Sequence, residues 1–158
     1  MASKKRYLQE ASGNWIASEI SVRYEKRFIS EEPIMTDGNA YRLFLHLWDK
    51  ERINFQEQLV ALFLNRRGKA IGYRIISIGK VESTTVDIRL IASLALHTLA
   101  SSVIVAHNHP SGFLEPSDAD IAVTKRIRDA LSLIDVKLLD HLIISESAYS
   151  SIDVKKLE

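Results

Sequence analysis

The chain has 158 residues, 46% of them hydrophobic and 26% charged, with a formal net charge of +1 at pH 7. This length suits one domain with a buried core, and the composition excludes the disordered and fibrous classes. The apolar stretches are too short to span a membrane, and no apolar segment follows the basic residues at 4–6. We therefore expect no secretory signal and a cytoplasmic protein.

The sequence contains no cysteine. Disulfide bonds and thiolate metal sites are therefore excluded, and any metal ion must be held by histidine and carboxylate side chains. The near-zero net charge offers no general attraction to nucleic acid. We interpret the short basic runs at 4–6, 66–69 and 125–128 as solvated surface.

The N-terminal part of the chain predicts a tail, a strand and a helix. Residues 1–13 mix polar and charged types without periodicity, so we expect a flexible tail there and a single domain over 14–158. Alternating apolar residues over 20–28 suggest a strand that could lie at a sheet edge. Apolar residues at helical spacing over 37–48 predict a helix.

The middle of the chain predicts a β-hairpin followed by a helix. Apolar runs at 59–64 and 70–78 flank a turn-forming sequence at 65–68, which is typical of a hairpin. The helix expected over 87–100 carries an apolar stripe that includes Leu99. Other leucines lie off this stripe, so we expect the helix to be covered on more than one side.

The C-terminal half predicts a strand, a helix and a second strand. The short run at 103–106 is apolar and β-branched, as in a central strand buried on both faces. A helix over 117–134 and a strand over 137–145 follow, and this order favours a parallel pair with a right-handed crossover. The predicted fold class is α/β with a mixed sheet, in which a hairpin precedes the parallel strands.

Two histidines and an aspartate lie close together in sequence where the predicted central strand ends. His107 and His109 are two residues apart on a strand, so their imidazoles point to the same side and converge. Asp120 belongs to the apolar stripe of the next helix, where a carboxylate is unfavourable without a cation or hydrogen-bond donors. Two histidines and one aspartate leave a tetrahedral zinc ion one open position for water, as in catalytic sites.

A helix capping box is the alternative interpretation of Ser117 and Asp120, because Ser-x-x-Asp is also the pattern of such a cap. Taken alone, this pattern favours the cap, and a lone His-x-His pair is a weak signal. The two patterns at this spacing are more specific together and favour a metal site. Capping and metal binding can coexist if Ser117 caps the helix while Asp120 turns to the metal.

Three motifs extend from the central strand to the last predicted strand: His-Asn-His-Pro-Ser-Gly at 107–112, Pro-Ser-x-x-Asp at 116–120 and Asp-His-Leu-Ile-Ile at 140–144. They resemble the JAMM (JAB/MPN+) metalloprotease motif. More narrowly, they resemble the JAB domain of the RadC family, bacterial proteins historically called DNA-repair proteins. The resemblance covers roughly residues 50–153.

This resemblance implies a fold and a metal site. The fold is cytidine-deaminase-like, with a mixed β-sheet sandwiched by helices. One zinc ion per chain would be held by His107, His109 and Asp120, and Ser117 would lie beside the reacting carbonyl as an oxyanion donor. A zinc-activated water would then attack an amide bond, and the products would be a carboxylate and an amine.

The resemblance also implies an upstream glutamate that acts as acid and base, and it places this residue at Glu57. Spacing alone could not separate Glu57 from Glu51 or Glu82. In this role the carboxylate would take a proton from the water and deliver it to the leaving amine.

Several polar residues near the motif are candidates for supporting the ligands. Adjacent residues on a strand face opposite ways, so at most one of Asp140 and His141 can point to the metal. We weigh Asp140 equally as a partner of a ligand imidazole and as a structural hydrogen-bonding group, and place His141 below it. For Ser111 and Asn108, we favour a role in fixing turns and loops over a role in the reaction. Ser111 is kept as a residue that supports the metal ligands.

Three functions follow as hypotheses. The first is a zinc metallopeptidase or isopeptidase acting on a protein or peptide, by analogy with JAMM relatives that cleave ubiquitin-like tags. The second is a DNA-repair accessory module that binds nucleic acid, and the third is a non-catalytic interaction domain. RadC-family proteins usually carry an N-terminal helix-hairpin-helix module, whereas residues 1–50 show no paired Gly-x-Gly, so we expect the single-domain form. The complete ligand set favours the peptidase.

Overall fold

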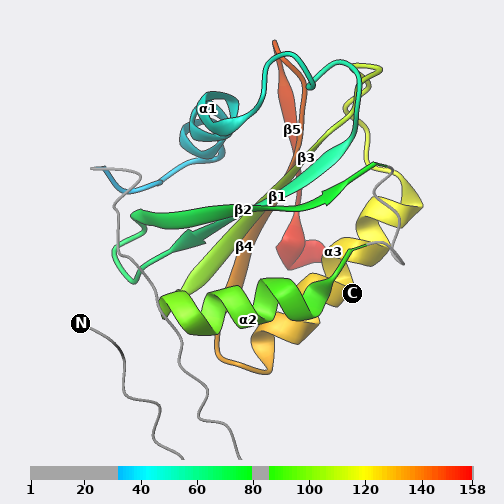
Figure 1. The fold of residues 1–158 in the computed structure, drawn as a ribbon. Helices are drawn as coiled ribbons and strands as arrows, with labels where there is room; N and C mark the ends of the chain where they lie inside the picture. The colour runs from blue at the N-terminus through cyan, green and yellow to red at the C-terminus, as the bar shows by residue number, and fades with distance from the viewer. Residues whose placement is uncertain (1–31, 80–85, 158) are drawn as a thin grey trace, which may run out of the picture.

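A computed structural model describes residues 32–79 and 86–157 of the chain. Within these ranges, five strands form one sheet and helices lie on both of its faces (Figure 1). The tail predicted over 1–13 and the strand predicted over 20–28 lie outside the described residues. The same is true of the N-terminal limit expected for the domain.

The elements follow one another as α1 (Asp37–Leu47), β1 (Gln58–Leu64), β2 (Ala70–Ile78), α2 (Ile88–Thr98), β3 (Ser102–Asn108), α3 (Asp118–Ser132), β4 (Lys137–Ile144), β5 (Tyr149–Ile152) and the 3-10 helix η1 (Val154–Lys156). The strand order in the sheet is β2-β1-β3-β4-β5. β3 and β4 are parallel, and the other neighbouring pairs are antiparallel. The predicted α/β class, the hairpin and the parallel pair are confirmed.

Both faces of the sheet are covered, because successive residues of a strand point to opposite sides. Leu59 and Phe63 of β1 pack against α2 and α3, whereas Leu62 and Leu64 pack against Phe44 of α1. Every residue of β1 and β3 is buried. These two strands therefore form a rigid centre, and any side chain at their ends is held by a core on either side.

The three helices are short. α1 and α2 have 11 residues each and α3 has 15, and no helix in the described ranges is long and apolar enough to cross a lipid bilayer. The prediction that the apolar stripe of this helix includes Leu99 is wrong. Leu99 lies beyond the last helical residue with a left-handed φ of 53°, and it is 87% exposed.

Candidate metal centre

His107, His109 and Asp120 meet at the C-terminal end of β3. The Nε2 atoms of the two imidazoles are 2.9 Å apart, and Oδ1 of Asp120 lies 3.1 Å from Nε2 of His107. The other carboxylate oxygen, Oδ2, lies 3.7 Å from Nε2 of His109. One ligand atom from each residue lies within 4.8 Å of the others, so this group could hold a metal ion. The structure thus brings together the three residues that the sequence predicts as ligands.

The centre is buried on one side and accessible on the other. The His107 side chain is fully buried and that of Asp120 is 4% exposed, whereas that of His109 is 16% exposed. Ser117, the residue directly before α3, is exposed. Among the described residues of the centre and its helix cap, His109 and Ser117 are therefore the ones that face solvent.

His109 presents the lone pair of Nε2 to the centre. Its Nδ1 lies 2.5 Å from the carbonyl oxygen of Phe113. A carbonyl can only accept, so Nδ1 must carry the proton, and a neutral ring then has none on Nε2. The turn before Phe113 needs Gly112, whose φ of 76° disfavours other residues, and Ser111 Oγ accepts the Phe113 N–H at 3.4 Å. Ser111 therefore fixes this turn and supports His109 through the backbone.

Asp120 takes part in both the helix cap and the centre. Ser117 Oγ accepts the backbone N–H of Asp120 at 3.2 Å, while Oδ2 of Asp120 accepts the Ser117 N–H at 2.8 Å and its hydroxyl at 2.6 Å. These contacts form a capping box at the start of α3. Oδ1 remains directed at His107. The two interpretations of Ser-x-x-Asp therefore coexist, because Oδ2 belongs to the helix cap and Oδ1 faces His107.

The carboxyl group of Asp120 is ionised. Burial alone would raise its pKa, but the hydrogen bond and charge of His107, together with the hydrogen bonds from Ser117, hold the pKa of Asp120 below its ordinary value. A buried carboxylate is unfavourable unless a cation or donors receive it. The centre therefore favours a positive charge between Asp120 and the two imidazoles.

The three donors fit a zinc ion. Zinc bound tetrahedrally at about 2.0–2.1 Å from nitrogen and oxygen places neighbouring ligand atoms about 3.3 Å apart. The observed separations of 2.9, 3.1 and 3.7 Å lie on both sides of this value. Imidazole nitrogen and carboxylate oxygen are also the donor types that remain in a chain without cysteine.

Glu57 lies directly before β1, the strand adjacent to β3. Leu59 of β1 lies opposite His107, so the antiparallel register, continued by two residues, places Glu57 opposite His109. Alternation puts Glu57 on the same face of the sheet as Leu59. Its carbonyl accepts the N–H of Gly79 at 2.8 Å, and the residue is partly buried. Glu57 is not one of the three residues of the metal-binding group.

The two alternatives to Glu57 differ in position. Glu51 is exposed in the turn that follows α1, and Glu82 lies outside the described residues. Of Glu51 and Glu57, only Glu57 directly precedes β1, two residues before Leu59, which pairs with His107.

Asn108 fixes the segment that leads to Glu57. Its side chain is completely buried, and its Oδ1 accepts the backbone N–H of Gln58 at 2.7 Å. Its Nδ2 donates to the carbonyls of Ile53 and Gln56 at 2.7 and 2.9 Å. The loop-fixing interpretation of Asn108 agrees with these contacts, which join residues about 50 positions apart in sequence.

Replacing Asn108 with alanine is expected to lower the free energy of unfolding by about 2–5 kcal/mol, because three backbone groups lose their partner and two of these hydrogen bonds are buried. Asn65→Ala is the matched control. Its Oδ1 also accepts two backbone N–H groups, from Arg67 and Lys69, but in a turn exposed to water. We expect it to cost about 1 kcal/mol. Urea denaturation of both variants measures the two free energies of unfolding. An equal decrease in both variants would contradict the prediction.

His141, not Asp140, contacts the centre. Nε2 of His141 lies 2.8 Å from Nδ1 of His107. The Asp140 carboxylate instead accepts the Ser151 hydroxyl at 2.6 Å and the backbone N–H of His141 at 2.8 Å. Of the two roles weighed for Asp140, these contacts match the structural hydrogen bonds and not the support of a ligand imidazole. Burial, followed by the charge of His107, holds the pKa of His141 well below its ordinary value.

A bulge in β4 explains this difference. Two consecutive residues of β3 pair with Leu138 and Asp140, so Leu139 is an extra residue without an opposite partner. An extra residue reverses the faces of all residues that follow it. Leu138 faces α3 as part of the core, and plain alternation would place Asp140 on that same face. The bulge places His141 there instead.

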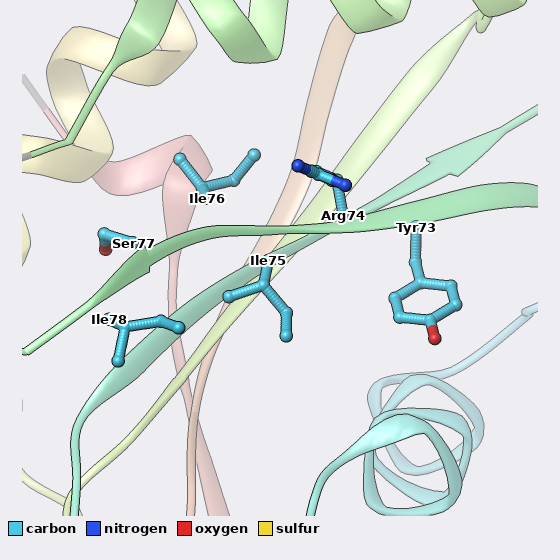
Figure 2. Close-up of a pocket in the computed structure, with 6 residues that line it drawn as sticks. All are labelled: Tyr73, Arg74, Ile75, Ile76, Ser77 and Ile78. Atoms are coloured by element: carbon cyan, nitrogen blue, oxygen red, sulfur yellow. The ribbon is translucent and has the colours of Figure 1, made fainter.

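A cavity of about 600 Å³ lies along β2 and is lined by residues 73–78. Tyr73 and Ile75 point to one side of the strand, and Arg74 and Ile76 point to the other (Figure 2). Ile78, at the end of this run, pairs with Gln58 of β1. The cavity therefore ends one residue from Glu57.

The fold and the centre define an α/β protein with a histidine-histidine-aspartate group at the end of a central strand. A family model described as the RadC-like JAB domain matches residues 34–157. The chain belongs to this family, as the sequence resemblance predicts. Family membership and the candidate metal group together support a hydrolase of the JAB type.

Curated relatives agree with this assignment. The chain is 41% identical over 138 residues to a UPF0758 protein of Neisseria gonorrhoeae, covering 86% of this chain and 60% of the relative. It is 47% identical over 95 residues to a UPF0758 protein of Flavobacterium johnsoniae, covering 60% of this chain and 42% of the relative. The chain therefore spans at most about 60% of the length of these relatives.

Proposed function

We propose that this protein is a zinc-dependent metallopeptidase or isopeptidase that hydrolyses an amide bond in a protein or peptide substrate. The observation that carries the proposal is the convergence of two imidazole Nε2 atoms and an ionised carboxylate within 4.8 Å, on a side accessible to solvent. His107, His109 and Asp120 would hold the ion. Three protein ligands leave a fourth position open, as in catalytic zinc sites.

A zinc ion, when bound, supplies Lewis-acid polarisation and lowers the pKa of a coordinated water molecule. Glu57 takes the proton of the attacking water and later delivers it to the nitrogen of the leaving amine. A carbon–oxygen bond forms, the carbon–nitrogen bond breaks, and a carboxylate and an amine result. The register position of Glu57 opposite His109 supports this role.

Ser117 donates a hydrogen bond to the oxyanion of the tetrahedral intermediate. Its hydroxyl lies next to the centre and donates at 2.6 Å to Oδ2 of Asp120. A rotation about the Cα–Cβ or Cβ–Oγ bond redirects this donor to the substrate, while the Ser117 N–H keeps its hydrogen bond to the carboxylate. An oxyanion donor of this kind contributes about 3 kcal/mol to stabilisation of the transition state.

A peptide as substrate is supported by the cavity along β2, which ends one residue from Glu57. Its lining has Arg74 and Ile76 on the face of the sheet that carries Leu59, and Tyr73 and Ile75 on the opposite face (Figure 2). An extended chain of alternating side chains suits such a surface. The scissile amide would then lie at the end of the cavity nearest to the centre.

Zinc content tests the proposal directly. Untagged protein purified without chelator is expected to contain about one zinc ion per chain by mass spectrometry of the metal. Removal with EDTA is expected to lower the Tm by several degrees, because binding to the folded state alone stabilises it, and added zinc should restore the Tm. His46→Gln, a change at an exposed histidine of α1, is the control and should keep its zinc. Protein without zinc, and with a Tm unaffected by zinc, would contradict the proposal.

A further inference from the structure

A chain of three buried hydrogen bonds links His107 to the backbone of Asp120. Nδ1 of His107 lies 2.8 Å from Nε2 of His141, whose Nδ1 lies 2.6 Å from Oγ1 of Thr124. Oγ1 of Thr124 lies 2.5 Å from the carbonyl oxygen of Asp120, one turn earlier in α3. Thr124 and His141 are both fully buried. The chain thus connects two candidate ligands through β4 and α3.

The direction of every bond in this chain follows from its last member. The carbonyl oxygen of Asp120 can only accept, so the single hydroxyl proton of Thr124 must point at it. Oγ1 of Thr124 must then accept from Nδ1 of His141. A neutral His141 with a proton on Nδ1 has none on Nε2, which therefore accepts from Nδ1 of His107.

The neutral form of His141 agrees with its contacts. Its ring is fully buried, and its two nitrogens face the ring of His107 and the hydroxyl of Thr124, neither of which is an anion. A second proton would create a buried cation beside a ring that also has to accommodate the positive charge of the centre.

We propose that Thr124 and His141 are positioning residues that hold His107 in the tautomer with its proton on Nδ1 and its Nε2 lone pair directed at the metal. His109 is held in the same tautomer by Phe113, so both imidazoles offer Nε2 to one point. The inference rests on the proposed function only in naming a metal as the group that both nitrogens face.

The opposite direction of these hydrogen bonds is unfavourable at Thr124 and incompatible with metal binding at His107. A proton on Nε2 of His141 would leave its Nδ1 and Oγ1 of Thr124 facing each other at 2.6 Å without a hydrogen, unless the hydroxyl abandoned the Asp120 carbonyl. It would also force the proton of a neutral His107 onto Nε2, the atom 3.1 Å from the Asp120 carboxylate. A neutral ring in that form cannot ligate a metal at this position.

The first test reads the tautomers by long-range ¹H–¹⁵N correlation NMR of the imidazole nitrogens. His141 is expected to carry its proton on Nδ1 in both the metal-free and the zinc-loaded protein, and His107 to do so in the zinc-loaded protein. His141→Gln assigns its signals. A proton found on Nε2 of His141 would overturn the inference. Because the His141 signal is readable without metal, failure to bind zinc would count against the proposed function alone.

The second test measures zinc affinity by competition with a chromogenic chelator. Thr124→Val keeps the shape of the side chain but removes the hydroxyl, and we expect about 10- to 100-fold weaker binding, the usual effect of losing a partner of a ligand histidine. Thr124→Ser keeps the hydroxyl and should bind within a few-fold of the unsubstituted protein.

Thr98→Val is the matched control for the second test. Thr98 Oγ1 also donates to a carbonyl one turn earlier, that of Leu94 at 2.7 Å, but near the end of α2. Thr98→Val should therefore leave zinc affinity unchanged. Unchanged affinity in Thr124→Val, or an equal loss in Thr98→Val, would overturn the inference, because either result assigns the hydroxyl a role only in helix stability.

Discussion

Asp120→Ala is expected to abolish stoichiometric zinc binding, with affinity reduced by more than about 100-fold, beyond the range for loss of a partner behind a ligand. The variant removes the only anion among the three donors and leaves two imidazoles that share one positive ion without a counter-charge. Zinc content after purification and competition with a chromogenic chelator measure the effect.

Ser117→Ala separates the metal from the helix cap. Both variants break the capping box at the start of α3, since Ser117 Oγ accepts the Asp120 N–H and the Asp120 carboxylate accepts the Ser117 N–H. Each loss of the cap should cost about 1 kcal/mol of stability in the metal-free protein. Ser117→Ala nevertheless keeps all three donors and should keep its zinc. Equal zinc loss in both variants would assign the effect to the cap.

The sequence predicts the elements that carry the centre because their local signals agree with the final packing. The runs that form β1 and β3 are apolar throughout, and both strands are buried on both faces. The spacing of His107 and His109 translates directly into two rings on one side of a strand end. The Ser-x-x-Asp pattern has two meanings in sequence, and the structure shows that both apply to Asp120.

The residues behind the ligands could not be predicted in the same way. Whether Asp140 or His141 faces the centre depends on the bulge at Leu139, and no sequence pattern in this strand predicts that bulge. The contacts of Asn108 join segments that only the folded sheet brings together. Thr124 had a usable signal, because a hydroxyl one turn after Asp120, on an otherwise apolar helix stripe, needs a buried partner.

Glu57→Gln is expected to lower the rate of amide hydrolysis by about 10²- to 10⁴-fold, the usual contribution of a general acid–base group. The glutamine side chain has nearly the size of the glutamate side chain, but it cannot take up a proton from water. Zinc affinity should stay within a few-fold, because Glu57 is not one of the three residues that form the metal-binding group. A mixture of synthetic linear peptides and one isopeptide-linked peptide, analysed by mass spectrometry for new amines, measures the rate.

Glu51→Gln and Glu82→Gln are the controls, since spacing in the sequence leaves both glutamates as alternatives to Glu57. Glu51 is exposed in the turn after α1, so its substitution should leave hydrolysis unchanged. A loss confined to Glu57→Gln, with zinc retained, would separate proton transfer from metal binding. A variant with full activity would show that the register position of Glu57 opposite His109 serves another purpose. If Glu82→Gln kept its zinc but hydrolysed the peptides more slowly, the proton-transfer role would instead be assigned to Glu82.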